Sequence, residues 1–309
     1  MSQYTGRNGS PPISVSQNYL TSAKTIRRLL GLTSLTKSDR AIEIGAGKGH
    51  ITRELAGKCH SVYAFEIDAK ICAYLQSKLG GIGNLHIRHQ DFLTVALPSS
   101  EPYKVFSNIP FSITSKIIRK LTGGGNPPQE AWLVMEKGTA KRFAGKSRDT
   151  TASLSLKPYF DCDIVHAFSR QDFHPMPSVD VVLLHLLRKE KPDIPLAQKR
   201  EFLRFVERGQ RYGLTALLTK RQVAAALKQA GLPRIEQSGL MLYVQWLCLF
   251  RCFRRFHGGQ NGPARCGTAR GLQRWTRAAA PFIRASTSLR EAMEVSPGVV
   301  IASAPWATP

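Results

Sequence analysis

The sequence predicts an α/β fold in which a mostly parallel sheet of seven strands is followed by a smaller helical domain. Three observations support this prediction. Short apolar strands alternate with helical segments from Arg40 to about Leu187, a glycine-rich turn joins the first of these strands to a helix, and the composition becomes strongly basic after Arg188. Strand–helix alternation of this kind is typical of a parallel sheet covered by helices on both faces.

The predicted helices and strands follow one another along the chain. Apolar residues three or four positions apart, or a helix start after a glycine turn, predict helices over residues 22–30, 50–56, 69–79 and 115–121. The predicted strands are residues 41–44, 61–67, 84–87, 104–106, 131–135, 161–168 and 179–187. The last two strands have no long helix between them, so we expect a hairpin-like pair that leaves one strand antiparallel at the end of the sheet.

Changes in composition divide the chain into four predicted parts. Residues 1–14 are polar and are predicted to be a flexible N-terminus, and residues 15–187 form the α/β domain. Residues 188–257 form a basic domain with helices at 198–209 and 221–230, the second ended by Gly231-Leu232-Pro233. Residues 258–309 contain no lysine and much Ala, Gly, Arg and Pro, which predicts a disordered tail.

The bulk composition narrows the class of partner. Of the 309 residues 42% are hydrophobic, which is enough for a large core, while the net charge of +23 attracts polyanions such as nucleic acid. The six cysteines form no Cys-x-x-Cys pair, so no metal site is predicted, and a secreted disulfide framework is not expected in a chain this long. The N-terminus has no apolar signal core and no apolar run reaches 18 residues. We therefore expect a cytoplasmic protein without a membrane span.

A glycine-rich turn, Gly45–Gly49, follows the first predicted strand and allows the backbone to approach a ligand closely. It matches neither common phosphate-binding motif. A dinucleotide fingerprint requires glycine where His50 stands, and a Walker loop requires glycine in place of Ile42 and a hydroxyl residue in place of Gly49. The turn alone therefore decides little, and the residues at the other strand ends must identify the ligand.

Glu66, Asp91 and Asn108 each stand at the end of one of the later predicted strands. In a parallel sheet these positions share one edge, where ligands bind. A Glu66 carboxylate that accepts ribose hydroxyls and an Asp91 carboxylate that accepts the amine of adenine together predict S-adenosylmethionine as the cofactor. Two structural alternatives stay open, namely Glu66 as a capping or solvated acid and Asp91 as an N-cap or turn residue.

The stretch Asn108-Ile109-Pro110-Phe111 combines an amide, a stiff turn and an aromatic ring. If the Asn108 side-chain oxygen and the Ile109 carbonyl accept the two hydrogens of an adenine N6, the nitrogen lone pair can face a methyl group. Pro110 would restrict the turn that orients these two acceptors. Phe111 would stack on the base. The alternative is that Asn108 only closes a turn.

Six motifs in order resemble those of the rRNA adenine N6-dimethyltransferases. They are Ser16–Leu20, Glu43–Gly49, Phe65–Asp68, Gln90–Phe92, Asn108–Phe111 and Phe173–Val179. Within that family, the Asn-Ile-Pro-Phe form and the segment Met241–Phe250, with Trp246, resemble the erythromycin-resistance (Erm) methyltransferases. The similarity covers about residues 14–256. It implies a Rossmann-like, seven-stranded methyltransferase domain with a small C-terminal helical domain.

The resemblance also implies roles for individual residues. Cofactor binding is implied for Asn18, Leu20, Gly45, Gly47, Glu66, Ile67, Asp91 and Asn108. A part in catalysis is implied for Asn108, Ile109, Pro110, Phe111 and Phe173, with Phe111 and Phe173 flanking the target adenine. Many relatives have tyrosine at the position of Phe111, so a hydroxyl there is not essential here. Taken alone, Phe173 fits core packing equally well, and no metal is implied.

The implied substrate is an adenosine in a 23S rRNA hairpin, modified before the ribosome is fully assembled. Methylation there blocks macrolide, lincosamide and streptogramin B antibiotics, and we expect the enzyme to be a monomer. The target base must be turned out of its stack. The basic helical domain, Lys116, Arg119, Lys141 and Arg142 are candidates for phosphate contacts, although any single lysine is also explained as a solvated surface residue.

Other functions stay open at this point. A housekeeping small-subunit (16S) rRNA adenine dimethyltransferase would use the same chemistry on another RNA, but the Asn-Ile-Pro-Phe form and Trp246 argue against it. A non-catalytic RNA-binding relative would be expected to lose the glycine turn or Asn108, and both are present. An amino-DNA methyltransferase usually has aspartate at position 108. Whether one or two methyl groups are added depends on the room in the pocket.

Overall fold

The computed structural model describes residues 18–145, 149–235 and 241–257. The predictions for residues 1–14, for Ser16 and Gln17 and for the tail 258–309 lie outside these residues. The chain forms two compact units. Of the described residues, the first unit contains those up to Glu207 and residues 241–243, and the second contains residues 208–235 and 244–257. The boundary falls inside a helix, and the predicted functional domains stay predictions.

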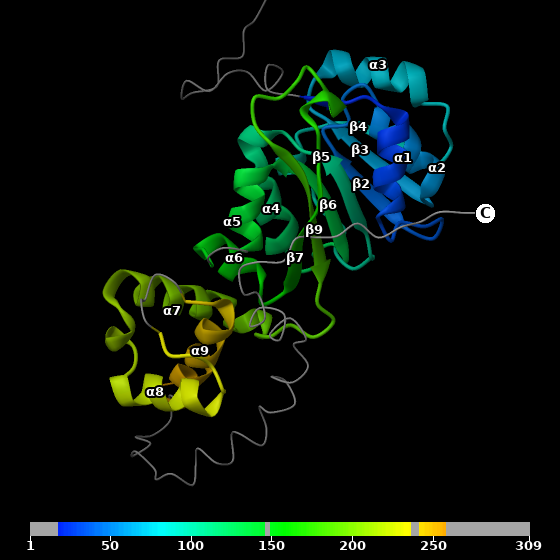
Figure 1. Cartoon of the computed structure of the whole chain (residues 1–309). Coiled ribbons are helices and arrows are strands. Elements are labelled where there is room, and N and C mark those ends of the chain that lie inside the picture. The colour runs from blue at the N-terminus through cyan, green and yellow to red at the C-terminus, as the bar shows by residue number, and fades with distance from the viewer. Residues whose placement is uncertain (1–17, 146–148, 236–240, 258–309) are drawn as a thin grey trace, which may run out of the picture. The chain divides into compact units, whose positions relative to one another are not determined.

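The first unit is built on a seven-stranded sheet with the order β4-β3-β2-β5-β6-β9-β7, shown in Figure 1. Its strands are β2 (Arg40–Ile44), β3 (Ser61–Glu66), β4 (Leu85–His89), β5 (Lys104–Asn108), β6 (Glu130–Glu136), β7 (Phe160–Ala167) and β9 (Val181–Arg188). The predicted α/β fold with seven strands is confirmed. β2 to β6 run parallel, and β9 is antiparallel to both of its neighbours, β6 and β7.

The predicted hairpin-like pair is confirmed, since β7 and β9 are antiparallel neighbours, but the antiparallel strand β9 does not lie at the edge of the sheet. β9 is the last strand in sequence, but it is inserted between β6 and β7, so that β7 forms the edge of the sheet. The burial patterns give the reason. Val181–Leu184 and Leu186 are buried without alternation, as in a strand covered on both faces, whereas β7 alternates between half-buried and exposed side chains. The strand with the alternating pattern therefore takes the edge.

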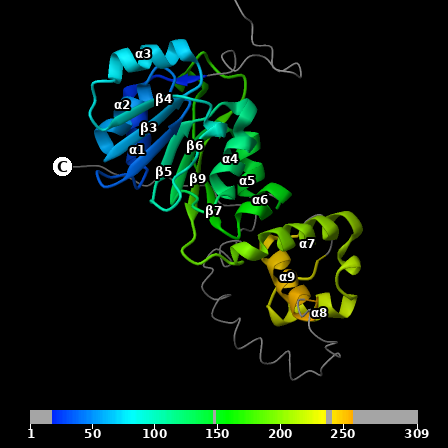
Figure 2. The same cartoon turned by 180° about the vertical axis from the view of Figure 1, so that it is seen from behind.

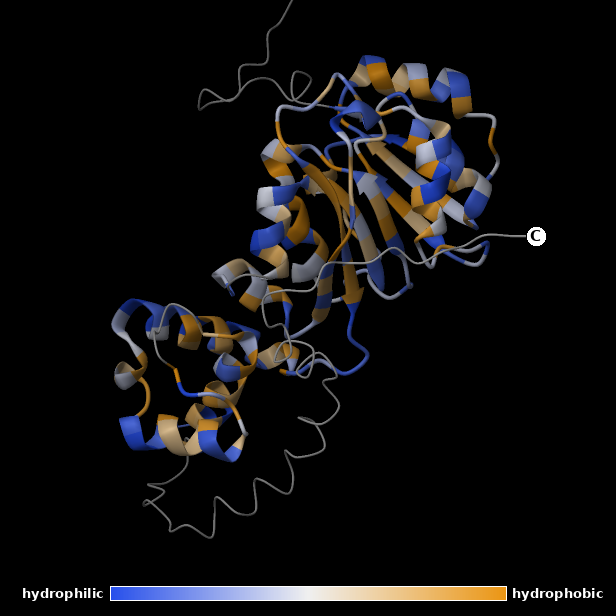
Figure 3. Ribbon diagram, viewed as in Figure 1, coloured by the Kyte–Doolittle hydropathy of each residue, from blue (hydrophilic) through white to orange (hydrophobic). Residues whose placement is uncertain are grey.

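Helices cover both faces of the sheet, as Figures 1 and 2 show. One face carries α1 (Ala23–Gly31), α2 (His50–Lys58) and α3 (Ala69–Leu79), and the other carries α4 (Thr114–Gly123), α5 (Lys137–Ala144) and α6 (Thr151–Leu156). The alternating side chains of the strands accordingly contribute to two apolar cores, one on each face of the sheet. The hydrophobic residues of the strands and helices are orange in the ribbon of Figure 3. The predicted helices are confirmed within about two residues, while α5 and α6 were not predicted because they are short.

A separate pair of two-residue strands joins distant parts of the chain. β1 (Tyr19–Leu20) pairs antiparallel with β8 (Phe173–His174), so that Leu20 lies opposite Phe173 and Tyr19 opposite His174. Strands this short show no periodicity, and the sequence did not predict them. The pairing matters because it joins the first and last of the six sequence motifs.

The remaining helices are α7 (Lys199–Tyr212), α8 (Lys220–Gln229) and α9 (Tyr243–His257). Gly231, with a φ of +65°, follows α8 in the conformation that favours glycine, which confirms the predicted helix stop. Within the second unit the buried Trp246 packs on Gly209, where an added Cβ would lie 2.8 Å from the indole ring. None of the helices in the described parts of the chain is long and apolar enough to cross a membrane.

Candidate active site

The candidate site lies at the carboxyl edge of the parallel strands, where β2, β3 and β5 end. The Ser107 side chain joins two of these strand ends, since its Oγ donates to the Ile44 carbonyl at 2.5 Å and accepts from the Ile44 N–H at 3.3 Å. Ser107 is completely buried. It thereby fixes the turn that starts at Gly45 against the turn that starts at Asn108.

The glycine turn depends on backbone conformations that side chains rarely adopt. Gly45, Gly47 and Gly49 have φ values of +71°, +55° and +83°. The Gly45 N–H donates to the Phe65 carbonyl at 2.8 Å, which anchors the turn to the neighbouring strand β3. The turn then leads directly into α2, whose first backbone N–H groups have no acceptor within the helix and donate no hydrogen bond to a side-chain cap.

Glu66 organises the turn from the end of β3. Its Oε2 accepts from the Gly47 N–H at 2.8 Å, and its Oε1 accepts from the N–H groups of Ile67 and Asp68 at 2.9 and 3.0 Å. The residue is only 1% exposed. Each carboxylate oxygen can accept two hydrogen bonds, so within the described residues Oε2 retains capacity for one more donor, such as a hydroxyl.

Tyr19 also lines a small cavity at this edge of the sheet. It belongs to the motif Ser16–Leu20, but no role was predicted for it. A Cβ added to Gly47 would come within 2.6 Å of its ring, so Tyr19 packs directly on the glycine turn. Burial raises the pKa of the Tyr19 hydroxyl, and the Glu66 and Asp68 carboxylates raise it further. An aromatic residue inside the first of the six motifs was the available signal, but its partner Gly47 could not be identified without the fold.

Asn108 is oriented by the backbone of Asn18. Its Nδ2 donates to the Asn18 carbonyl at 2.7 Å. Because a carbonyl oxygen only accepts, the amide must turn its nitrogen toward Asn18 and present Oδ1 on its other side. The half-buried Asn108 side chain thus offers an acceptor, as an adenine N6 donor would require.

The residues after Asn108 form a rigid turn. The Ile109 N–H donates to the Val134 carbonyl at 3.2 Å, and the Pro110 carbonyl accepts from the Ile113 N–H at 3.2 Å and the Thr114 hydroxyl at 3.3 Å. The Ile109 carbonyl accepts no hydrogen bond from the described residues. It is therefore available as the second acceptor, beside a half-buried Phe111.

The structure brings Phe173 to the same region but encloses its ring. Phe173 is 4% exposed and lies edge-to-face with Phe168 at 5.2 Å between ring centroids. Its backbone pairs with Leu20, which is itself buried. The ring contributes to the apolar core, which was the structural alternative, and its proposed second role of flanking a base remains a prediction.

Asp91 and Ile67 complete the predicted cofactor residues. The Asp91 Oδ1 accepts from the Leu93 N–H at 2.8 Å and caps the short helix Phe92–Thr94, as the structural alternative expected. The Ile67 side chain is 43% exposed at the end of β3. An exposed aliphatic side chain at this edge suits the face of a flat base such as adenine.

Several of these residues line one small cavity of about 10 Å³. It is formed by Asn18, Tyr19, Gly45 and the stretch Asn108–Phe111. The glycine turn, which starts at Gly45, and the Asn-Ile-Pro-Phe turn therefore border the same cavity. The predicted residues Glu66, Ile67 and Asp91 lie along the same edge of the sheet, at the ends of the two strands beyond β2.

Comparison with known proteins identifies the family. The model of the ribosomal RNA adenine dimethylase family matches residues 12–230, which is more than half of the chain. The chain belongs to the ribosomal RNA adenine dimethylase family. It is accordingly an rRNA adenine methyltransferase, and the family implies an S-adenosylmethionine donor.

Individual proteins of known name resemble this chain in sequence and in fold. The chain is 35% identical to the rRNA adenine N-6-methyltransferase of Lysinibacillus sphaericus, over 79% of this chain and 97% of that protein. It is 34% identical to the protein of the same name from Limosilactobacillus reuteri, over 78% and 96%. A crystal structure of the 23S rRNA methyltransferase ErmE superposes with a TM-score of 0.69 at 29% identity, covering 76% of this chain and 99% of the other.

The residues at the site fit the cofactor of an adenine methyltransferase. The glycine turn supplies a backbone surface, Glu66 retains acceptor capacity at Oε2 and Ile67 exposes an apolar side chain. No cluster of three or more potential metal ligands occurs among the described residues.

Proposed function

We propose that the chain transfers a methyl group from S-adenosylmethionine to N6 of one adenosine in 23S rRNA, which gives resistance to macrolides, lincosamides and streptogramin B. The hydrogen bond from Asn108 Nδ2 to the Asn18 carbonyl carries this proposal, because it leaves Oδ1 as an acceptor beside the Ile109 carbonyl. The fold similarity to ErmE and the Asn-Ile-Pro-Phe sequence favour 23S rRNA as the substrate.

The two acceptors would act on the target nitrogen. Asn108 Oδ1 and the Ile109 carbonyl each accept a hydrogen bond from one of the two N6 hydrogens. These hydrogen bonds reduce the delocalisation of the nitrogen lone pair into the ring. The buried Ser107 and the Val134 carbonyl hold the two acceptors in place, so little reorganisation is needed during the reaction. The cofactor supplies a methyl group on a positively charged sulfonium. Phe111 holds the base by stacking, and Phe173 closes the pocket behind it.

Cofactor binding is proposed for the residues at the carboxyl edge. Asn18, Leu20 and the glycine turn enclose the amino-acid end, Glu66 Oε2 accepts a ribose hydroxyl, and Asp91 with Ile67 holds the adenine. The N6 amine of the cofactor would bind the Asp91 oxygen that does not cap the short helix. Helix α2 contributes backbone N–H groups near the carboxylate of the cofactor.

The cellular setting follows from the substrate. We propose that the protein is a cytoplasmic monomer that acts on 23S rRNA before the ribosome is fully assembled. Residues 188–257 would provide much of the phosphate-binding surface, together with α4 and α5. Phosphate contacts of this kind position the RNA and leave the choice of base to the site itself.

Primer extension on 23S and 16S rRNA from cells expressing the protein tests the proposal. We expect a stop at one adenosine of the 23S rRNA, together with raised resistance to a macrolide. Cells expressing Asn108→Ala serve as the matched control and should show neither. A modified 16S rRNA beside an unmodified 23S rRNA would instead assign the protein to small-subunit modification.

A further inference from the structure

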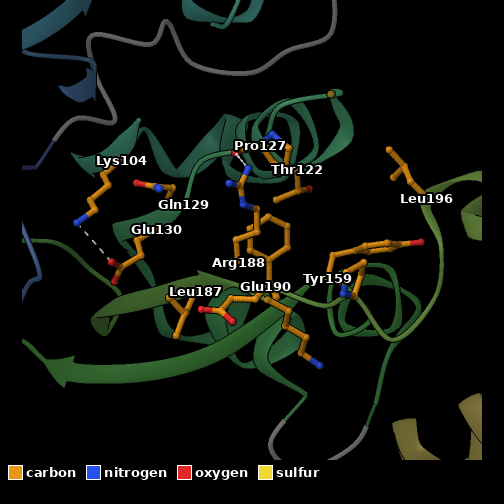
Figure 4. A pocket seen from close by; sticks show the side chains of 14 residues that line it. Lys104, Thr122, Pro127, Gln129, Glu130, Tyr159, Leu187, Arg188, Glu190 and Leu196 are labelled. Carbon is orange, nitrogen blue, oxygen red and sulfur yellow. Dashed lines mark hydrogen bonds and ion pairs between the residues drawn. The ribbon is translucent and has the colours of Figure 1, made fainter. Parts of the chain in front are cut away.

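A cavity of about 530 Å³ opens at the edge of the sheet opposite the candidate active site. Figure 4 shows the side chains that line it. Lys104 and Glu130, which begin β5 and β6, line it together with Arg188 at the end of β9 and Phe160 at the start of β7. Since β5 ends at Asn108, the cavity and the catalytic turn lie at opposite ends of the same strand. Its volume is typical of small-ligand sites.

The lysines of this cavity are already neutralised. Lys104 Nζ lies 3.1 Å from an oxygen of Asp39 and 3.6 Å from one of Glu130. Lys189 Nζ lies 2.7 Å from Asp193 and 3.6 Å from Asp161. Paired ammonium groups attract an additional anion weakly, so the cavity is not suited to a phosphate group.

Arg188 and Glu190 are the charged groups left for a ligand. The Arg188 Nη1 donates to the Pro127 carbonyl at 2.8 Å, and among the described residues the guanidinium has no carboxylate partner. The exposed Glu190 carboxylate has no cationic partner among these residues either. Gln129 adds a side-chain amide to the wall of the cavity. The cavity thus has no excess charge but offers both donors and acceptors.

The rest of the wall is apolar or aromatic. Leu187 and Leu196 are 41% and 55% exposed, which is unusual for large aliphatic side chains in a single hollow. Tyr159 contributes an aromatic ring beside Phe160. A flat ligand with apolar faces and polar edges, such as a nucleobase, would satisfy these surfaces together with Arg188, Glu190 and Gln129.

We propose that this cavity binds a guanine base. Guanine presents O6 and N7 as adjacent acceptors, which suit the Arg188 guanidinium, and it presents the N1 and N2 hydrogens as adjacent donors, which suit the Glu190 carboxylate. Adenine lacks the acceptor at position 6 and both of these donors. Cytosine and uracil are smaller and do not present this combination on two edges.

The position of the cavity favours a guanine of the substrate RNA over a free guanine nucleotide. Helix α4 starts directly after the turn that holds Phe111, and Thr122 and Gly124 at its other end line the cavity. Its 10 residues span about 15 Å. RNA lying along the exposed Lys116 and Arg119 of this helix would reach both sites. This choice of source rests on the proposed function, whereas the guanine site itself does not.

Titration with free nucleotides tests the site without any methylation assay. Saturation-transfer NMR would compare GMP with AMP, CMP, UMP and IMP, the last of which lacks the N2 amine. We expect GMP to bind most tightly and Glu190→Gln to weaken GMP binding by about fivefold or more. Glu207→Gln is the matched control, because Glu207 is an exposed carboxylate outside the cavity. Equal binding of GMP and AMP, or unchanged GMP binding by Glu190→Gln, overturns the proposal.

A second arm identifies the source of the guanine. Each guanosine of an RNA hairpin substrate is replaced in turn by inosine, and KM is measured for the wild-type protein and for Glu190→Gln. One replacement that raises KM in the wild type but not in Glu190→Gln assigns the site to that nucleotide of the RNA. If GMP binds selectively and no replacement has this effect, the ligand is a free guanine nucleotide. If the RNA is not methylated at all, the proposed function fails while the GMP result stands.

Discussion

The side-chain amide of Asn108 donates to the backbone carbonyl of Asn18 at 2.7 Å, across 90 positions of sequence. The orientation of the Asn108 amide, and with it the direction of the Oδ1 acceptor, is therefore set by a residue that directly precedes the N-terminal strand β1. That strand places Tyr19 on Gly47 and Leu20 opposite Phe173. Asn18, Tyr19 and Leu20 thus contact the turn at Asn108, the glycine turn and the late aromatic motif in order.

Substitution of Asn108 tests this arrangement most directly. We expect Asn108→Ala to lower kcat by at least about 100-fold, because both the Oδ1 acceptor and its orientation are removed. Transfer of a radiolabelled methyl group to RNA measures the rate, and a filter-binding assay should show unchanged RNA affinity. Asn108→Asp keeps an oxygen at Oδ1 but faces the Asn18 carbonyl with a second oxygen, so it should fail as well. Near-normal turnover by either variant would contradict the assigned role.

The contact between Gly47 and Tyr19 predicts a steric effect on cofactor binding. We expect Gly47→Ala to weaken S-adenosylmethionine binding by at least about tenfold, because its Cβ would collide with the ring and its φ of +55° is strained for alanine. Calorimetric titration measures this affinity. Gly57→Ala is the matched control, since Gly57 lies in α2 with open space around it. Truncating Tyr19 in the Gly47→Ala background should recover part of the affinity, and no recovery would show that the ring is not the obstacle.

Glu43 predicts a pH dependence of stability. Burial raises the pKa of the Glu43 carboxyl to about 8. The Thr52 hydroxyl lowers this pKa, and the Glu66 carboxylate raises it further. A carboxyl group that binds its proton more tightly when folded stabilises the protein fully below its unfolded pKa, and this contribution disappears as the pH rises toward 8. We expect the free energy of unfolding to fall between about pH 5 and 8 in the wild type. Glu43→Gln should flatten that fall in urea denaturation, and an unchanged slope would assign it to other groups.

The two aromatic residues should separate into stability and activity effects. We expect Phe173→Ala to destabilise the protein by about 3–5 kcal/mol, because the ring is buried. Phe111→Ala should cost less stability but lower kcat, since this half-buried ring is available for stacking. Phe111→Tyr should retain activity. Thermal denaturation and methyl transfer are measured on all three, and a Phe111→Ala variant with normal turnover would exclude stacking by this residue.

The exposed cations of α4 should appear in the salt dependence of RNA binding. We expect Lys116→Ala combined with Arg119→Ala to reduce the slope of log K against log salt by about 0.7–0.9 for each phosphate that the protein no longer neutralises. Lys70→Ala on α3 is the matched control, because it removes an exposed cation that is not a candidate for phosphate binding. If the Lys70 variant alters the slope as much as the double variant does, then α4 is not the RNA path.

Most of the α/β unit was predictable because each of its strands and longer helices can be recognised from a short stretch of neighbouring residues. The strands β2, β3 and β5 are apolar runs ending in Ile44, Glu66 and Asn108, and they end where the polar or glycine-rich turns begin. α5 and α6 were missed because short helices carry little periodicity. The place of β9 was misjudged because an unbroken apolar run does not say which two strands it will lie between.

By itself, the sequence determined the fold class, the order of motifs along the carboxyl edge and the resemblance to rRNA adenine methyltransferases. Periodicity and side-chain chemistry are properties of short segments, and they can be recognised without knowledge of distant contacts. Only the tertiary structure decided that Asn18 orients Asn108, that Tyr19 covers Gly47 and that Arg188 and Glu190 share a cavity. The first two of these relationships join residues far apart in sequence, and the cavity forms only where β5, β6, β7 and β9 meet. Such contacts exist once the strands have paired and the helices have closed over them.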